Sequence, residues 1–240
     1  MNCNNCKTEV SSKFCPDCGQ PSALKRIDGH YIIHEIEHVL HFERGILYTI
    51  RELTINPGQN IRRYLTENRS RLVKPIIFII LTSLIYSIII NFFHIEEQYV
   101  KFEGDGAKLG TPMKVFAWIK GHYGYANIIM GAFIAFWTKL FFKKHQYNYF
   151  EILILLCFVL GIAMLIFSIF AMLAGLTNLK ISQIGGIVGM IYISWAIGQF
   201  FGRDKIFNYV KAIFAYLLGM LTFGILAFLL GMFIDLIIKH

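Results

Sequence analysis

Charged side chains are scarce in this sequence. Only 16% of its 240 residues are Asp, Glu, Lys or Arg, whereas soluble globular domains carry about 25%. Intrinsic disorder is excluded as well, because it requires low hydrophobicity and 56% of these residues are hydrophobic. Cysteine is rare too, with five residues, so the chain is not a secreted scaffold held together by disulfides. We therefore expect most of the chain to be embedded in a lipid bilayer.

The long apolar stretches all follow residue 74. Five of them approach or exceed the roughly 20 helical residues that cross a hydrocarbon core about 30 Å thick. They cover residues 75–93, 126–142, 152–176, 184–201 and 210–234. These runs are continuous and lack the alternation of barrel strands. The predicted fold is an all-α membrane protein, with a five-helix transmembrane bundle over residues 75–240. A zinc ribbon (residues 1–22) and amphipathic juxtamembrane helices (residues 23–74) are expected to precede it.

The distribution of Lys and Arg predicts how the bundle is oriented. With the N-terminus in the cytoplasm, 17 basic residues lie in inside segments and 6 in outside segments, as the positive-inside rule requires. The C-terminus is then outside. The start Met1-Asn2-Cys3 does not resemble a signal peptide, so the first span is expected to act as an uncleaved insertion signal. This bias explains the net charge of +8, which therefore does not indicate a nucleic-acid partner.

Four of the five cysteines lie in the first 18 residues. Two residues separate Cys3 from Cys6, and two separate Cys15 from Cys18. Paired motifs of this spacing are typical of zinc ribbons, in which four thiolates enclose a structural Zn²⁺. Two disulfides or idle thiols are the alternative, but a cytoplasmic location keeps thiols reduced. A segment this short cannot bury a hydrophobic core. The metal is therefore expected to supply its folding energy.

A histidine-rich helix is predicted between the cysteines and the first span. At 100° per residue, one face carries four histidines and the opposite face is apolar; the histidines are His30, His34, His38 and His41. Three interpretations remain open. The face meets solvent, lipid headgroups or other cytoplasmic elements; it forms a second metal or pH-sensing site; or it is catalytic. In the catalytic case His34 and His38 bind zinc in an H-E-x-x-H motif and Glu35 activates water.

Basic residues are concentrated just before the first span. A short amphipathic helix is expected from Ile46, closed by the turn signal Asn56-Pro57-Gly58. It is followed by Arg62, Arg63, Arg69, Arg71 and Lys74. Basic side chains this close to a membrane attract anionic headgroups, which predicts a lipid- or partner-binding set. Positive-inside orientation alone would also produce this pattern.

The order of these features resembles that of a known bacterial family. The cysteine ribbon and histidine-bearing helix are followed by Gly45-x-Leu47-Tyr48-Thr49, Pro57-Gly58, Ile61-Arg62-x-Tyr64, Arg69 and Pro75. In this order they resemble a family of uncharacterised multi-pass membrane proteins with a zinc ribbon. The family is described only as a domain of unknown function. The resemblance covers about residues 1–80 and implies a bacterial inner-membrane location. It implies no activity.

Small residues in the fourth apolar stretch and directly after it suggest close helix packing. Gly185 and Gly189 are spaced four apart, as are Gly198 and Gly202, which lets a neighbouring helix approach. The neighbour is either another helix of the same bundle or a second copy of the chain. A short helix beginning at Thr111-Pro112 is expected between the first two spans.

The function favoured by the sequence is a binding, regulatory or assembly module in the membrane. The zinc ribbon and histidine helix would bind a cytoplasmic protein partner or lipid. A zinc-dependent membrane-associated hydrolase built on His34, Glu35 and His38 is the alternative. A small transporter or pore is the third class. The apolar stretches carry no charge near their centres, which disfavours ion-coupled transport.

Overall fold

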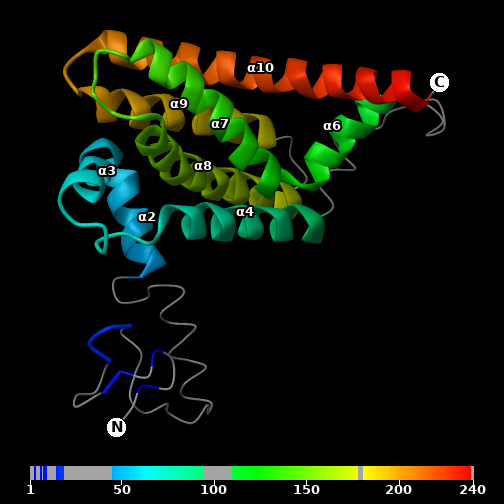
Figure 1. Ribbon diagram of the computed structural model, residues 1–240. Helices are drawn as coiled ribbons and strands as arrows, with labels where there is room; N and C mark the ends of the chain where they lie inside the picture. The colour runs from blue at the N-terminus through cyan, green and yellow to red at the C-terminus, as the bar shows by residue number, and fades with distance from the viewer. Residues whose placement is uncertain are drawn as a thin grey trace. The chain divides into compact units, whose positions relative to one another are not determined.

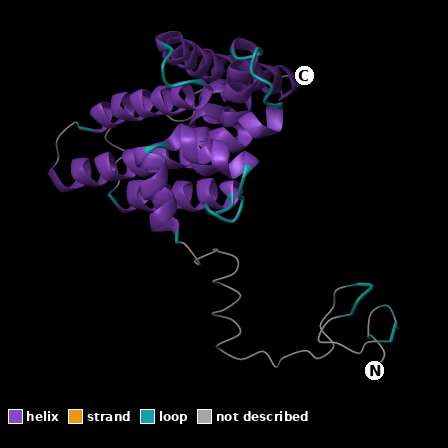
Figure 2. Cartoon of the chain, turned by 90° about the vertical axis from the view of Figure 1, so that its left-hand side faces the viewer, coloured by secondary structure: helices purple, strands orange, loops and turns teal. Residues whose placement is uncertain are grey.

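The structure is a computed structural model, and it describes Cys3, Cys6, Thr8, Glu9 and residues 15–18, 45–93, 110–177 and 181–238. The chain divides into two compact units, Met1–Glu43 and Arg44–His240. The described residues of the second unit form helices joined by short loops (Figure 1, Figure 2). An all-α fold is thus confirmed for this part of the chain.

The second unit begins with two short helices, α2 (Ile46–Ile55) and α3 (Pro57–Thr66). The remaining helices are α4 (Pro75–Phe92), α6 (Thr111–Gly121), α7 (Tyr123–Phe141), α8 (Tyr149–Thr177), α9 (Ser182–Phe201) and α10 (Ile206–Ile238). In the described residues α4, α8, α9 and α10 are long and apolar enough to cross a membrane. This confirms four of the five predicted stretches. The stretch 126–142 corresponds to α7, whose apolar part Ala126–Phe141 is shorter than the other four.

Proline and glycine place several helix boundaries. Pro57 and Pro75 occupy the first position of α3 and α4, where the missing N–H is tolerated and φ is already helical. The helix predicted to start at Thr111-Pro112 is present as α6. At the end of α9, Gly202 has φ 142°, a conformation that favours glycine. The carbonyl of Gly202 accepts a hydrogen bond from Asn208 Nδ2 at 3.1 Å, which holds the turn into α10.

Helix α8 forms the centre of the second unit. Two thirds of the most apolar segment of α8 is buried, compared with 17% of the corresponding segment of α10. Helix α8 packs against α4, α7 and α9. Leu155, Phe158 and Leu160 are at most 1% exposed. Because α10 exposes most of its apolar surface, its outer face is suited to contact lipid chains rather than water.

The long helices run alternately between two ends of the unit (Figure 1). At one end, the ring of His145, in the loop between α7 and α8, lies 5.2 Å from that of Phe201. Lys211 Nζ, near the start of α10, lies 5.8 Å from the Phe142 ring. We call this end, with α3, the loop 142–148 and the turn 202–205, the basic end. The opposite end, which contains α6 and the C-terminal part of α10, is the far end. Helix α7 runs from the far end to the basic end, and α8 returns from the basic end.

Candidate metal centre and docked juxtamembrane helices

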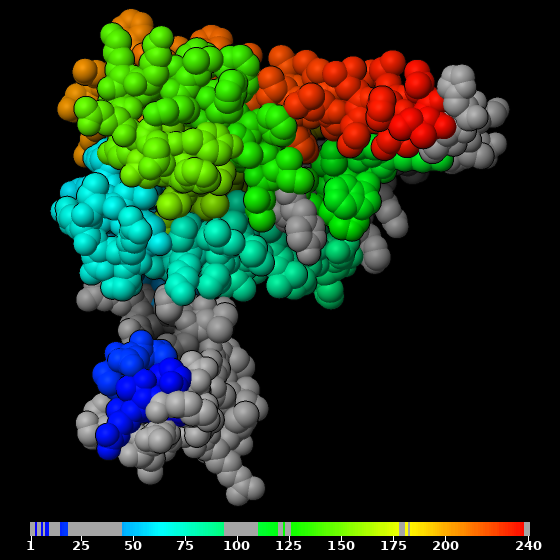
Figure 3. Space-filling view, viewed as in Figure 1, coloured from blue at the N-terminus to red at the C-terminus, as the bar shows by residue number. Residues whose placement is uncertain are grey.

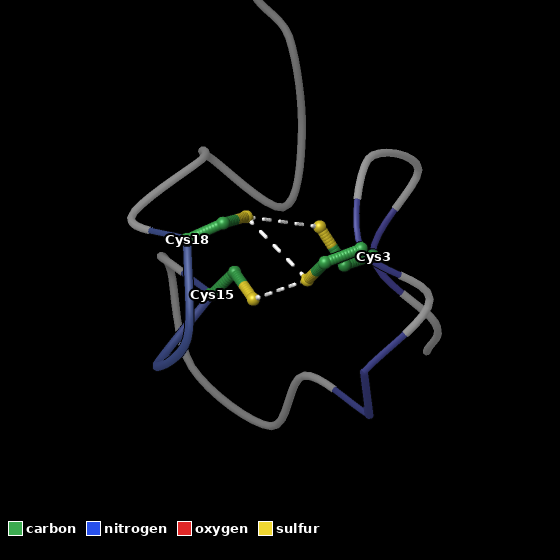
Figure 4. A group of neighbouring side chains, drawn as sticks. Cys3, Cys15 and Cys18 are labelled. Carbon is green, nitrogen blue, oxygen red and sulfur yellow. Dashed lines mark hydrogen bonds between the residues drawn. The ribbon is translucent and has the colours of Figure 1, made fainter.

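The four N-terminal cysteines come together in the first unit. Cys3 and Cys15 are buried, whereas Cys6 and Cys18 are exposed. The Sγ atom of Cys6 lies 3.4 Å from that of Cys15 and 3.5 Å from that of Cys18. The Sγ atoms of Cys3 and Cys18 are also 3.5 Å apart, and the sulfur atoms point toward a common centre (Figure 4). All four lie within 4.8 Å of one another.

These distances fit a tetrahedral metal–thiolate site. A Zn–S bond of about 2.3 Å places the sulfur atoms of a tetrahedron about 3.8 Å apart, whereas a disulfide requires about 2.05 Å. The observed separations of 3.4 to 3.5 Å are near the first value and far from the second. The four cysteines therefore form a possible metal site, as the sequence predicted. Four thiolates would complete the coordination of Zn²⁺ and leave no position for substrate.

Thr8 connects the two cysteine pairs. The backbone N–H of Cys3 donates to the Thr8 carbonyl at 2.8 Å, which closes the first pair into a turn. The Thr8 hydroxyl donates to Asp17 Oδ2 at 2.7 Å, and Asp17 lies between the cysteines of the second pair. Hydrogen bonding with the side chain and then the backbone of Thr8 lowers the pKa of the Cys6 thiol to about 6. The pKa of the Cys15 thiol, which shares a hydrogen bond with Cys6, is raised to about 11. Because the thiolate is the form that binds metal, Cys15 would release its proton when the metal binds.

The histidine-bearing segment lies outside the described residues. The positions concerned are His30, His34, Glu35, His38 and His41. A second metal site and the H-E-x-x-H hydrolase therefore stay predictions. In the part of the chain that the structure describes, the four cysteines are the one group of three or more side chains that could hold a metal ion.

Helices α2 and α3 dock onto the basic end of the bundle. Leu53 of α2 and Ile61 of α3 are completely buried. The ring of Tyr64 packs edge-on against that of Phe158 in α8, with 5.2 Å between centroids. These three side chains are thus covered by the rest of the chain, although Leu47 and Ile55 of α2 remain exposed. Such packing stabilises helices too short to be stable alone.

Gly58 brings the start of α3 into contact with the end of α9. A Cβ atom on Gly58 would lie 2.5 Å from the carbonyl carbon of Gln199 and 2.6 Å from the nitrogen of Phe200. The backbone N–H of Gly58 also donates to Gln199 Oε1 at 2.9 Å. The free first-turn N–H of α3 thereby gains a partner, and the Gln199 side chain, 5% exposed, has its oxygen satisfied.

Arg62 caps the C-terminus of α9. Its Nη1 atom donates to the carbonyl of Gln199 at 2.8 Å and to that of Phe200 at 2.6 Å. These carbonyls belong to the last turn of the helix, whose acceptors have no partner within the helix and carry the negative end of its dipole. A guanidinium is suited to this position because it presents several N–H donors and stays charged.

Further polar contacts fix α2 to the chain around it. Arg71 Nη2 lies 2.8 Å from Glu52 Oε2, and Arg71 Nε donates to Tyr48 Oη at 3.2 Å. The Arg71 and Glu52 side chains are 24% and 19% exposed, so the pair is largely shielded. In α9, the buried Tyr192 hydroxyl donates to the carbonyl of Leu53 at 3.0 Å.

The structure separates the five predicted lipid- or partner-binding residues into two groups. Arg62 and Arg71 are engaged within the chain, as described above. Arg63 has a 40% exposed side chain and lies 4.0 Å from Glu67, an exposed pair. Arg69 and Lys74 are exposed. The prediction of a lipid- or partner-binding surface therefore rests on Arg63, Arg69 and Lys74, and it is untested.

The four glycines predicted to mediate helix packing contact the same chain. A Cβ on Gly185 or Gly189 would overlap the rings of Phe170 and Phe167 in α8. A Cβ on Gly198 would overlap the Tyr209 ring in α10, and Gly202 forms the turn described above. These contacts favour packing within the bundle, and self-association through these residues stays a prediction.

Sequence reasoning missed the partners of α2 and α3. It treated Gly58 as part of a turn that ends a helix, whereas α3 begins there. Gln199 and Tyr192 received no role, because their contacts join residues 139 and 141 positions apart. A polar Gln199 at the end of an apolar run and a glycine directly after a helix-starting proline were the available signals.

The comparison with known proteins finds a match for the segment that contains α2 and α3. Residues 43–87 match a family described as "Protein of unknown function (DUF3667)". The match includes α2, α3 and the first two thirds of α4. No curated protein and no solved structure matches the chain. The segment similar to this family is thus the one that joins the N-terminal region to the bundle.

Proposed function

We propose that this is a five-span membrane protein whose N-terminal unit binds one structural zinc ion and acts as a binding or assembly module in the cytoplasm. The observation that carries the proposal is the convergence of four cysteine Sγ atoms within 4.8 Å of one another. A closed four-thiolate site holds a small unit folded and performs no chemistry. Such a unit supplies a surface for a partner protein.

The docked helices support this function. Buried contacts of Gly58, Arg62 and Leu53 with α9 fix α2 and α3 to the bundle. The cysteine unit is thus connected through the chain to helices that are held on the bundle. Its effective concentration is raised for a partner that is itself bound to the same membrane.

The exposed cations at the basic end support the proposed orientation. Lys143, Lys144, Arg203 and Lys205 are exposed and lie on the same end of the bundle as α3. The positive-inside rule places that end in the cytoplasm. With five spans, the far end and the C-terminus are outside. We expect a reporter fused after His240 to be located outside the cytoplasm. A reporter located in the cytoplasm would refute the five-span arrangement.

The zinc proposal is tested by metal analysis of the purified full chain. The wild type is expected to contain one zinc per chain, and Cys15→Ser to contain less than a tenth of that, because three thiolates leave the tetrahedron incomplete. Cys157→Ala is the matched control, since Cys157 is buried in α8 and separate from the cluster. Equal zinc in the wild type and Cys15→Ser would refute the proposal.

The partner-binding role is tested in cells with a photoreactive amino acid at Pro16, an exposed position between the ligands. The wild type and Cys157→Ala are expected to give the same discrete cross-linked adduct. Cys15→Ser is expected to lose it while remaining in the membrane at the same level. An adduct unaffected by Cys15→Ser, or no adduct in any variant, would refute a zinc-dependent binding module.

A further inference from the structure

A cavity opens at the far end, where α6 and α7 pass along α10. The two helices follow one another and are separated by His122, whose φ of −127° and ψ of 43° break the helix. Both pack against α10, which continues without interruption from Ile206 to Ile238. Figure 3 shows α6 beside the terminal part of α10. A bent pair of helices therefore lies against a continuous one.

Two close contacts fix the bent pair to α10 on either side of the break. On the α7 side, Gly219 lies so close to Ile134 that a Cβ would meet its backbone. On the α6 side, Gly231 approaches Pro112 in the same way, and Thr111 hydrogen-bonds to Asp235. Between these points the chain bows away from α10. The bow leaves a cavity of about 490 Å³.

The cavity lining is apolar except at one position. Trp118 from α6, Phe133 from α7, and Ala227 and Leu230 from α10 contribute to its wall. The exception is Lys114, which is exposed and forms no ion pair with any carboxylate of the described residues. The volume lies within the roughly 300–1,000 Å³ of ligand sites. A space with this lining offers water almost no hydrogen-bond partners.

The position of the cavity along α10 places it in one leaflet. Its α10 residues, Phe223 to Leu230, follow the exposed Lys211 by 12 to 19 residues, or about 18 to 29 Å at 1.5 Å per residue. With Lys211 at the headgroups of the basic end, a hydrocarbon core of about 30 Å puts the cavity in the opposite half of the bilayer. Lys114 lies two residues from Pro112, which contacts Gly231. Its ammonium is thus at the level of the far headgroups.

We infer that this cavity binds one acyl chain of an anionic membrane phospholipid, whose headgroup phosphate pairs with Lys114. The apolar wall takes the chain, because the hydrocarbon chain is what surrounds the protein at this depth. The free ammonium group supplies the complementary charge at the rim. The helix break at His122 thus creates the space that the acyl chain occupies.

The test uses the purified full chain, stripped with detergent and incubated with phosphatidylglycerol or phosphatidylcholine, and native mass spectrometry counts the bound lipids. The wild type is expected to retain one phosphatidylglycerol. Ala227→Phe places a phenyl ring in the path of the acyl chain and is expected to reduce retention at least tenfold, whereas Ala117→Phe, on the exposed face of α6, is the matched control and retains it. Equal retention in the two variants, or no lipid bound to the wild type, would overturn the proposal.

The charge at the rim is tested separately. Lys114→Gln is expected to lower the preference for phosphatidylglycerol over phosphatidylcholine by about fivefold, the effect of one cation near a membrane surface. Lys144→Gln, which removes an exposed cation at the basic end, is expected to leave that preference unchanged. A wild type without any preference, or one that Lys114→Gln does not alter, contradicts the assignment of Lys114.

A spectroscopic measurement covers the case in which Ala227→Phe fails to fold. In a Trp137→Phe/Trp195→Phe chain, Trp118 is the remaining tryptophan and lies in the cavity wall. Phosphatidylglycerol with brominated chains, titrated in detergent, is expected to quench its fluorescence and to saturate at one lipid per chain. Quenching that rises without saturation indicates bulk contact only and overturns the site.

Discussion

Replacing Gly58 by alanine should detach α3 from α9. The new Cβ would lie 2.5 Å from the Gln199 carbonyl carbon, where ordinary van der Waals contact begins at 3.4 Å. Both the Cβ and the opposing backbone are fixed, so no side-chain rotation relieves the overlap. The two helices must separate by about 1 Å, which is typical of overpacking that costs 1–3 kcal/mol.

The separation also weakens the hydrogen bonds around the contact. The Gly58 N–H to Gln199 bond and the two Arg62 bonds lengthen together. Buried bonds of this kind contribute about 1 kcal/mol each, and those to a charged group more. Alanine returns about 1 kcal/mol through its higher helix propensity. We expect a net loss of about 3 kcal/mol in the docking free energy of α3.

Hydrogen exchange of the purified full chain in detergent measures this loss. A change of about 3 kcal/mol corresponds to roughly a hundredfold faster exchange of the α3 amides. Gly186→Ala is the matched control, because a Cβ on Gly186 of α9 would meet nothing within 4 Å. In Gly186→Ala, the α3 amides should exchange as in the wild type or more slowly. Unchanged or greater α3 protection in Gly58→Ala would show that α3 does not sit on the α9 backbone.

Four further variants at the basic end are tested by chemical unfolding in detergent and compared with the wild type. Tyr192→Phe removes the donor to the α2 backbone and should cost about 1 kcal/mol; a neutral result refutes that bond. Glu52→Gln should destabilise the protein because it removes the shielded partner of Arg71, whereas Glu67→Gln, at the exposed pair, should cause no measurable change; equal effects would contradict this ranking. Burial and the two nearby lysines lower the pKa of His145, so the unfolded chain binds the proton more tightly. Stability should therefore fall as the pH drops below about 6.5 toward the lowered pKa. His145→Gln should flatten this dependence, and an unchanged slope would refute it.

Hydropathy alone located most of the helices. The stretches 75–93, 152–176 and 184–201 match α4, α8 and α9 to within a few residues, because a lipid-exposed span must be both helical and apolar. Helix α10 extends four residues beyond each end of the predicted stretch. The predicted stretch ended before Asp235 because that residue is charged, whereas the helix continues through it and its carboxylate accepts hydrogen bonds from Thr111.

The four-cysteine cluster could be predicted because its members are close in sequence. Each pair of cysteines is brought together by a local turn, and only a gap of eight residues separates the pairs. The dock of α2 and α3 could not be predicted, since Gly58 and Arg62 meet residues of α9 more than 130 positions away. A basic residue before a span has the same local pattern whether it faces lipid headgroups or caps a distant helix. The cavity also depends on distant pairs, such as Gly219 with Ile134.

The dock on α9 also sets a time order for assembly in the membrane. Helices α2 and α3 leave the ribosome about 140 residues before Gln199, which at 5–20 residues per second takes about 7 to 28 s. During this interval the N–H of Gly58 and the guanidinium of Arg62 do not yet have the acceptors that they bind in the finished protein. The segment completes its folding only after α9 has been synthesised and has packed against it. Arrival of α9 is therefore the step that commits the juxtamembrane helices to their final place.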